Sequence, residues 1–261
     1  EELAGCWFYP IKINNRGDVL AGGGSYTNSD FFVYLVKSNG DWIKIESATG
    51  PGGMNYFAND LNDSGTVVGS AMTADGLSSE PFIWDPVDGY RRFVHEGLDA
   101  YAWKINNQGD WVGNLTDPVT WSSYPAYVVG GENVDSGADP STYYLDINDA
   151  GEAFGTYGYS SSNPTAFLAI GPWRFDTGLP CYPPAFSEAT LSYRFGGVMN
   201  DSGEFTSVDV WSAGDHGALN AWLYNGTFHR ISVFDTDHWE FTTESVNNSG
   251  LTGGMASDGM Y

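Results

Sequence analysis

Short apolar runs separated by glycine-containing turns extend along the whole chain. A run such as 101–105 ends on an apolar residue directly before an Asn, and the runs that follow the turns, such as 67–70 and 111–114, are small and apolar. Aromatic and β-branched residues bounded by Gly, Asn and Asp are typical of β-strands joined by tight turns. The pattern therefore predicts strands throughout, with almost no helix.

One turn signature recurs six times, at intervals of 42 to 52 residues. It consists of an apolar residue, Asn, a second Asn or Asp, any residue, and Gly. The Asn and Gly positions are Asn14 and Gly17, Asn62 and Gly65, Asn106 and Gly109, Asn148 and Gly151, Asn200 and Gly203, and Asn247 and Gly250. An Asn side chain that binds its own backbone, followed by a Gly in the left-handed conformation, predicts a hairpin at each copy.

Two further strands are predicted after each of the first five hairpins. Aromatic-rich third strands are predicted at 31–34, 81–84, 126–129, 166–169 and 221–224, and fourth strands at 41–45, 90–94, 132–134, 173–175 and 227–231. Four strands in about 45 residues is the size of a β-propeller blade. We therefore predict an all-β propeller of four-stranded antiparallel blades, forming a single domain over 1–261, with repeat units that begin near 6, 53, 97, 140, 188 and 236.

These residues carry a family resemblance. A strand that ends Ile-Asn, a Gly-containing turn, a Val-Val-Gly strand and an Ala-Phe-Leu-Trp-like strand resemble the HAF repeat of extracellular bacterial and archaeal proteins. The resemblance covers nearly the whole chain and implies a β-propeller, but no common activity. The His that often opens the third strand of that repeat is replaced here by Asp30, Glu80, Pro125, Thr165 and Asn220.

The sixth repeat is incomplete. Its hairpin near Val246 predicts a third strand near position 267, but the sequence ends at Tyr261. Only 1–5 precede the first strand, which is too short to supply two strands. Three interpretations follow: downstream sequence completes the blade, the ring has five blades with an extra hairpin, or a neighbouring molecule supplies strands. Because open strand edges recruit other chains, we expect association through the terminal hairpin.

Net charge excludes one class of partner. Ten Lys and Arg against 33 Asp and Glu give a formal net charge of −23, which repels nucleic-acid phosphates and acidic lipid headgroups. No apolar run approaches the roughly 18 residues that span a bilayer. The sequence opens at Glu1 without Met, as expected of a secreted protein after removal of a signal peptide, although a trimmed chain begins in the same way. An extracellular or cell-surface location is therefore expected.

The two cysteines leave several states open. Cys6 and Cys181 fit one disulfide in an oxidising compartment. Two unpaired thiols, or bonds to other chains, fit their separation equally.

Catalytic and metal-binding motifs are absent from the sequence. The four histidines, His95, His216, His229 and His238, lie in no recognised catalytic frame. A glycosidase needs two facing carboxylates, and the strand-associated acids are Asp60, Asp99, Asp146, Asp209 and Asp235, but nothing in the sequence pairs them. The turns lack the Asp spacing and the distal Glu of a calcium loop, so we predict no cofactor and leave loop calcium open.

The aromatic residues divide into two groups. Tyr34, Trp84, Tyr127 and Trp222 recur in the third strand and are expected to pack between blades. Tryptophans outside that position are candidates for surface recognition or subunit contact, above all Trp121, Trp211 and Trp239. A lectin is expected to repeat its site in each blade, and no polar-aromatic cluster repeats.

The sequence thus favours a non-enzymatic extracellular structural or adhesive module, a self-assembling subunit of a surface layer or filament whose main partners are copies of itself. A glycan-binding propeller that takes surface glycans is the alternative, and a glycoside hydrolase is a weaker third.

Overall fold

The computed structural model describes residues 6–26, 31–45, 56–72, 79–134, 142–157, 165–170, 173–176, 190–195, 197–213, 216–231 and 240–257. These residues form β-strands, turns and bends, with no helix among them, and every described strand pair is antiparallel. The predicted all-β, antiparallel organisation is therefore confirmed. The chain divides into two compact units, Glu1–Ala126 and Tyr127–Tyr261, and each is described by itself. The predicted single domain over 1–261 stays a prediction.

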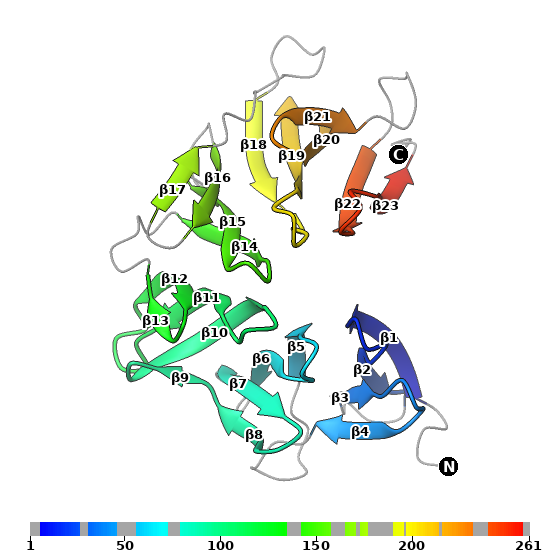
Figure 1. Cartoon of the computed structure of the whole chain (residues 1–261), viewed down its shortest axis with the longest axis vertical. Coiled ribbons are helices and arrows are strands. Elements are labelled where there is room, and N and C mark those ends of the chain that lie inside the picture. Colours follow the sequence, from blue (N-terminus) through cyan, green and yellow to red (C-terminus); the bar gives the residue numbers. More distant parts are fainter. Residues whose placement is uncertain are drawn as a thin grey trace. The chain divides into compact units, whose positions relative to one another are not determined.

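The first unit begins with two four-stranded sheets in which consecutive strands are neighbours (Figure 1). The first sheet contains β1 (Cys6–Ile13), β2 (Val19–Ser25), β3 (Phe31–Val36) and β4 (Trp42–Ile45), and the second contains β5 (Tyr56–Leu61), β6 (Val67–Met72), β7 (Ser79–Asp85) and β8 (Gly89–Arg92). The third sheet has the order β13-β12-β11-β10-β9, from β9 (Val94–His95), β10 (Leu98–Ile105), β11 (Trp111–Thr116), β12 (Ser123–Val129) and β13 (Glu132–Asn133). The boundary between the units falls within β12.

The second unit repeats the same meander. Its two four-stranded sheets contain β14 (Tyr143–Ile147), β15 (Glu152–Tyr157), β16 (Thr165–Ile170) and β17 (Trp173–Asp176), and then β18 (Thr190–Phe195), β19 (Phe205–Ala213), β20 (His216–Tyr224) and β21 (Phe228–Ile231). Among the described residues the last sheet has two strands, β22 (Glu240–Val246) and β23 (Thr252–Ser257).

One predicted strand differs from the structure. The strand predicted at 90–94 ends at Arg92 as β8, and Val94 belongs to β9. Glu96 and Gly97 both have positive φ, 52° and 84°, which is the geometry of a tight two-residue hairpin turn. This turn folds Val94 and His95 back onto β10, where they pair with Asp99 and Leu98.

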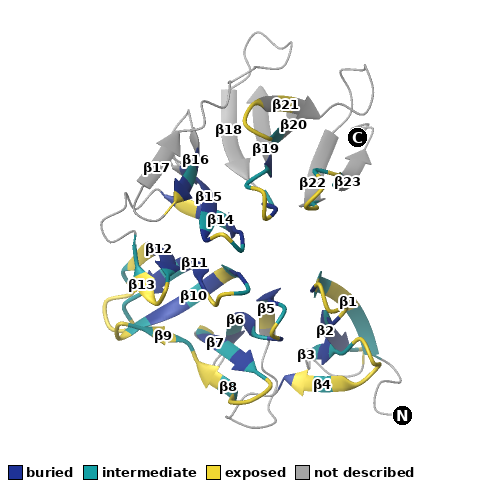
Figure 2. Cartoon of the chain, in the orientation of Figure 1, coloured by how far each residue is buried: buried dark blue, intermediate teal, exposed yellow. Residues whose placement is uncertain are grey.

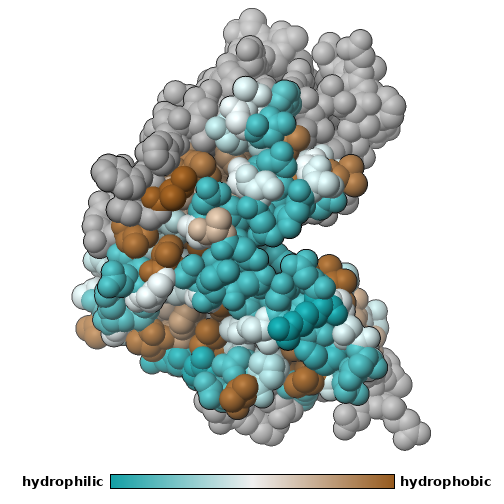
Figure 3. Space-filling model, viewed as in Figure 1, coloured by the Kyte–Doolittle hydropathy of each residue, from teal (hydrophilic) through white to brown (hydrophobic). Residues whose placement is uncertain are grey.

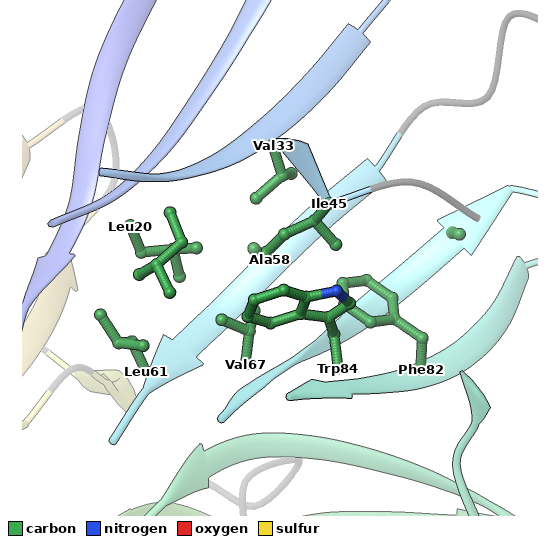
Figure 4. Close-up of a cluster of buried hydrophobic side chains, with 10 residues drawn as sticks. Leu20, Val33, Ile45, Ala58, Leu61, Val67, Phe82 and Trp84 are labelled. Carbon is green, nitrogen blue, oxygen red and sulfur yellow. The ribbon is translucent and has the colours of Figure 1, made fainter. Parts of the chain in front are cut away.

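The hydrophobic core of the first unit lies between its first two sheets (Figure 4). It is formed by Leu20, Val33, Leu35 and Ile45 from the first sheet and by Ala58, Leu61, Val67, Ala71, Phe82 and Trp84 from the second. Burying each of the larger side chains contributes roughly 1.5–3 kcal/mol relative to exposure. In the second unit, Phe154 stacks on Phe205 with ring centroids 4.0 Å apart. Packing between neighbouring sheets therefore builds the core.

A β-bulge explains the glycines of the second strands. The register of β5 and β6 shifts between Ala58 and Asp60, opposite Gly69. A Cβ on Gly69 would lie 2.3 Å from the Phe57 carbonyl oxygen. The same clash occurs at Gly113, where a Cβ would lie 2.0 Å from the Tyr101 carbonyl oxygen. The bulged partner strand of the hairpin therefore leaves no room for a side chain at these positions.

Each hairpin turn is organised by its Asn. In the first turn, the Asn14 side-chain oxygen Oδ1 accepts hydrogen bonds from the backbone N–H groups of Arg16 at 3.0 Å and Asp18 at 2.9 Å. The Gly17 N–H binds the Asn14 carbonyl oxygen at 3.0 Å, and φ of Gly17 is +77°. The Gly of the other five turns also has positive φ, between 75° and 90°.

The other end of the Asn side chain connects neighbouring turns. In the first unit, Asn14 Nδ2 donates to the Asn62 carbonyl oxygen at 3.1 Å, and Asn62 Nδ2 donates to that of Asn106 at 3.0 Å. In parallel, the Asn15 N–H donates to Asp63 Oδ1 at 2.8 Å, and the Asp63 N–H donates to Asn107 Oδ1 at 2.7 Å. We call these two lines of hydrogen bonds the turn ladder.

The second unit contains the same ladder. Asn148 Nδ2 donates to the Asn200 carbonyl oxygen at 3.3 Å, and Asn200 Nδ2 donates to that of Asn247 at 2.9 Å. The Asp201 N–H donates to Asn248 Oδ1 at 3.0 Å. In the turn ladder of both units, every donor therefore belongs to the earlier turn and every acceptor to the later one. The side-chain amides of Asn107 and Asn248 lie outside these two lines and donate in the opposite direction, to Asp63 and Asp201.

A pair of matched substitutions separates the two functions of the turn Asn. Asn62→Asp keeps Oδ1 but removes the donor to Asn106 and places a carboxylate where the side chain is buried, so we expect a loss of about 1–3 kcal/mol of unfolding free energy. Asn247→Asp removes a donor that has no acceptor among the described residues, and we expect a change within about 0.5 kcal/mol. Urea unfolding at low protein concentration measures both. Equal losses would show that the inter-turn bonds do not stabilise the fold.

Candidate functional site

The candidate functional residues lie in two turns of the ladder, the last turn of the second unit and the first turn of the first unit, and each turn is described by itself. At the last turn, the Asn247 side-chain amide Nδ2 and the Asn248 N–H are the two groups that donate to a following turn elsewhere in the ladder. Within the part of the chain that the structure describes, neither has a hydrogen-bond acceptor. Asn247 is also exposed, whereas the turn Asn of the other five repeats is buried.

The first turn presents the complementary acceptors. In the second, third, fifth and sixth turns, a carbonyl and an Oδ1 at these positions accept from the preceding turn. In the described residues, Asn15 Oδ1 accepts no hydrogen bond, and the Asn14 carbonyl oxygen accepts only that of Gly17. The first turn thus has unfilled acceptors where the last turn has unfilled donors.

A buried carboxylate holds the first turn in place. Asp18 is 1% exposed, and its Oδ1 accepts the Ser38 N–H at 3.0 Å while Oδ2 binds Lys37 Nζ. Burial alone raises the pKa of Asp18, but the hydrogen bonds from Lys37 and Ser38 outweigh it and hold the pKa below its ordinary value. Asp18 is therefore charged at neutral pH, and it fixes the first turn to the β3–β4 connection.

Strand register identifies the outer face of the first sheet. On the second sheet, Val67 pairs with Leu61 and Trp84, and all three are buried against the first sheet. On the first sheet, Val19 has the corresponding position, because it pairs with Ile13 and Val36.

The exposure of these corresponding positions differs sharply. Leu61 is 2% exposed, whereas Ile13 is 64% exposed. The outer face of the first sheet is therefore built like a face that packs against a neighbouring sheet, but it is open.

Aromatic side chains continue this outer face. The ring centroid of Phe8 lies 5.5 Å from that of Phe32, 5.9 Å from that of Tyr34 and 5.6 Å from that of Trp42. Trp42 is 48% exposed, and Figure 2 shows part of β4 as exposed. We call Phe8, Ile13, Val19, Phe32, Tyr34 and Trp42 the first-sheet outer face. Figure 3 shows mainly hydrophilic residues over the described hairpin turns on this side of the molecule.

Of the three predicted recognition tryptophans, Trp121 is the one whose side chain the structure describes. Trp121 is 62% exposed and has a φ of 58°, which is unusual for a residue other than Gly. Asp117 Oδ1 holds its loop by accepting the N–H groups of Val119 and Thr120, and these bonds keep the pKa of Asp117 below its ordinary value. Trp211 lies in β19 but its side chain is not among those described, and Trp239 lies outside the described residues.

The remaining predicted residues give no metal or thiol site that the structure describes. Cys6 begins β1 and is half-buried, while Cys181 lies outside the described residues, so their pairing stays a prediction. Within the described ranges, no group of three or more His, Cys, Asp or Glu side chains is arranged to hold a metal ion. His229 Nε2 lies 3.0 Å from the Thr227 hydroxyl and 3.1 Å from Asn225 Oδ1. Among the described residues, no helix is long and apolar enough to cross a membrane.

The buried acids have structural partners. Asp60 Oδ2 accepts the Ile105 N–H at 3.0 Å, and Asp60 Oδ1 lies 3.2 Å from Lys12 Nζ. Asp146 Oδ2 accepts the Met199 N–H at 2.7 Å.

Asp99 binds the guanidinium of Arg92 through two hydrogen bonds of 2.7 Å, and this contact raises the pKa of Arg92. Asp60, Asp99 and Asp146 therefore tie neighbouring segments together. The side chain of Asp209 and the whole of Asp235 are outside those described.

No protein-family model and no curated protein matches this sequence. Among solved structures, the chain is similar to the β-propeller domain of the Trilobed protease from Pyrococcus furiosus, which has an open velcro topology (8% identity, 97% of this chain and 96% of that chain, TM-score 0.44). It is also similar to a mutant of AofleA from Arthrobotrys oligospora (10% identity, 98% and 76%, TM-score 0.40) and to a mutant Aleuria aurantia lectin in complex with Fucα1-6GlcNAc (10% identity, 94% and 86%, TM-score 0.40). At these TM-scores the likenesses carry no functional argument.

Proposed function

We propose that this chain is a non-enzymatic, extracellular structural or adhesive protein that assembles with copies of itself through its terminal repeats. The observation that supports this function most directly is the turn ladder: among the described residues, the Asn247 amide and the Asn248 N–H donate to no following turn, and the Asn14 carbonyl and Asn15 Oδ1 accept from no preceding turn. A chain that carries both the donors and the acceptors of one kind of contact suits a repeating assembly.

The proposed architecture is a β-propeller of the HAF-repeat type, with five complete blades and a sixth partial blade. It is supported by the meander of each four-stranded sheet and by the packing of the second sheet on the first. The two-stranded sheet β22–β23 is the partial blade in this proposal. An extracellular location agrees with the repeat resemblance and with the one disulfide that Cys6 and Cys181 would form.

A structural function also agrees with the contacts of the acidic side chains that a glycoside hydrolase would need. Asp60, Asp99 and Asp146, which the sequence offered as carboxylates for glycoside hydrolysis, bind backbone N–H groups or basic side chains. These contacts favour an architectural role for each of the three acids.

Self-assembly predicts a size that depends on concentration. We expect the purified chain to sediment as a monomer when dilute and to form larger species as its concentration rises, with ordered polymers visible by electron microscopy. Analytical ultracentrifugation over a hundredfold range of concentration measures this. A homogeneous monomer throughout that range, with no polymer in micrographs, would overturn the proposed function.

Glycan binding is the second candidate, and one observation favours it. Trp121 presents a largely exposed ring on a loop that Asp117 holds, with Val119 and Tyr124 exposed nearby in the sequence. Flat aromatic faces of this kind pack against the apolar faces of sugar rings.

A glycan array tests this candidate. Trp121→Ala should lower the affinity for a bound glycan roughly tenfold or more, as expected for truncation of an aromatic binding residue. Trp42→Ala, which removes an equally large ring that is 48% exposed on the first sheet, should leave that affinity unchanged. The absence of array binding, or equal losses in both variants, would exclude recognition through Trp121.

A further inference from the structure

We propose that the last turn of one copy docks onto the first turn and the first-sheet outer face of a second copy, and so continues the turn ladder between molecules. This inference rests on the proposed function, because it specifies the contact through which the copies assemble. The occupant of the open face is thus the β22–β23 hairpin of another copy of this chain.

The hydrogen bonds of this contact follow from those inside the chain. At four contacts between consecutive turns, which we call joints, the turn Asn donates through Nδ2 to the carbonyl oxygen of the next turn Asn, over 2.9–3.3 Å. The same geometry pairs Asn247 Nδ2 with the Asn14 carbonyl oxygen of the second copy. It also pairs the Asn248 N–H with Asn15 Oδ1, as the Asp201 N–H pairs with Asn248 Oδ1. Among the described residues, neither of these two donors has an acceptor, and neither of these two oxygens accepts a hydrogen bond from a preceding turn.

The backbone of the last hairpin has the shape that the joints require. β22 and β23 are antiparallel and their register shifts between Thr243 and Ser245. The hairpin of the second sheet has the same shift, between Ala58 and Asp60, at the same distance before its turn Asn. The last turn also forms its own backbone bonds, from Asn247 N–H to the Leu251 carbonyl at 3.0 Å and from Gly250 N–H to that of Asn247 at 2.9 Å.

The apolar surface of the acceptor supplies the rest of the contact. Ile13 and Val19 occupy the positions at which Leu61 and Val67 are buried against the preceding sheet. Covering the outer face would remove exposed apolar surface from water, as it does at the joint between the first two sheets.

Charge also favours a contact between the last turn of one copy and the first turn of another over a contact between two last turns or two first turns. Residues 6–45 contain four Lys and Arg against three Asp, and Lys12 and Lys37 are already paired with Asp60 and Asp18, so this segment is close to neutral. The segment 231–261 contains no Lys or Arg, while β22 carries Glu240 and Glu244. Contact between unlike ends is heterologous, so each added copy leaves one donor end and one acceptor end open.

Two variants with complementary defects test this contact. Ile13→Glu charges the outer face and blocks the acceptor end, while Asn247→Asp removes the amide and blocks the donor end. We expect each variant alone to remain monomeric at concentrations where the wild type polymerises. An equimolar mixture should form 1:1 heterodimers and nothing larger, because only one intact donor end and one intact acceptor end remain per pair. Sedimentation of the mixture measures this.

A matched control places the same charge elsewhere. Val87→Glu changes a residue that is 91% exposed, in the turn between β7 and β8, and this variant should polymerise like the wild type. If the wild type polymerises but both blocked variants do so too, or if the mixture stays monomeric, the contact is wrong while self-assembly stands. If the wild type never polymerises, the proposed function fails, and the contact fails with it.

Stability distinguishes a second copy from the chain's own last hairpin. Ile13 is 64% exposed, so Ile13→Glu should leave the unfolding free energy of the dilute protein unchanged, whereas Leu61→Glu should lower it severely. A loss at Ile13 comparable to that at Leu61 would show that the chain covers this face itself, and would overturn the contact between copies.

Discussion

The rest of the structure depends on the two ends of the asparagine side chain in four of the hairpin turns, at Asn14, Asn62, Asn148 and Asn200. The oxygen closes the turn to which it belongs, and the amide nitrogen binds the backbone of the following turn. No other neutral side chain of this length offers an acceptor and a donor on opposite branches of one planar group. Because one residue serves both purposes, the local hairpin and the joint to the next sheet are specified together.

This arrangement also gives the chain a direction. A contact built from donors on one turn and acceptors on the next differs between its two sides, and a linear series of such turns has unlike ends. The buried Asp18 holds the first turn, while the exposed Asn247 marks the last. A polar interaction of modest strength, repeated in register, therefore has consequences for assembly that the hydrophobic core alone would not have.

Much of the fold follows from the sequence because it is local. The Asn and Gly spacing predicts the hairpins, and the strand ranges around them agree with the structure to within a few residues, including 6–13, 42–45 and 228–231. The return of Val94 onto β10 depends on positive φ at Glu96, which the sequence does not signal. The partner of the Asn14 amide could not be predicted either, because it lies 48 residues away on another sheet.

The second position of each turn has a consequence of its own. Asp63 lies between Asn15 and Asn107, and its carboxylate accepts the amide of each, at 3.0 and 2.9 Å. Where Asp149 meets Asp201 instead, two acids are neighbours and the backbone bond lengthens to 3.3 Å. The choice between Asn and Asp at one turn is thus not independent of the choice at the next. Chemical ageing that deamidates Asn107 would place a new negative charge beside Asp63. Damage to one turn would therefore weaken the contact between the turns of two sheets.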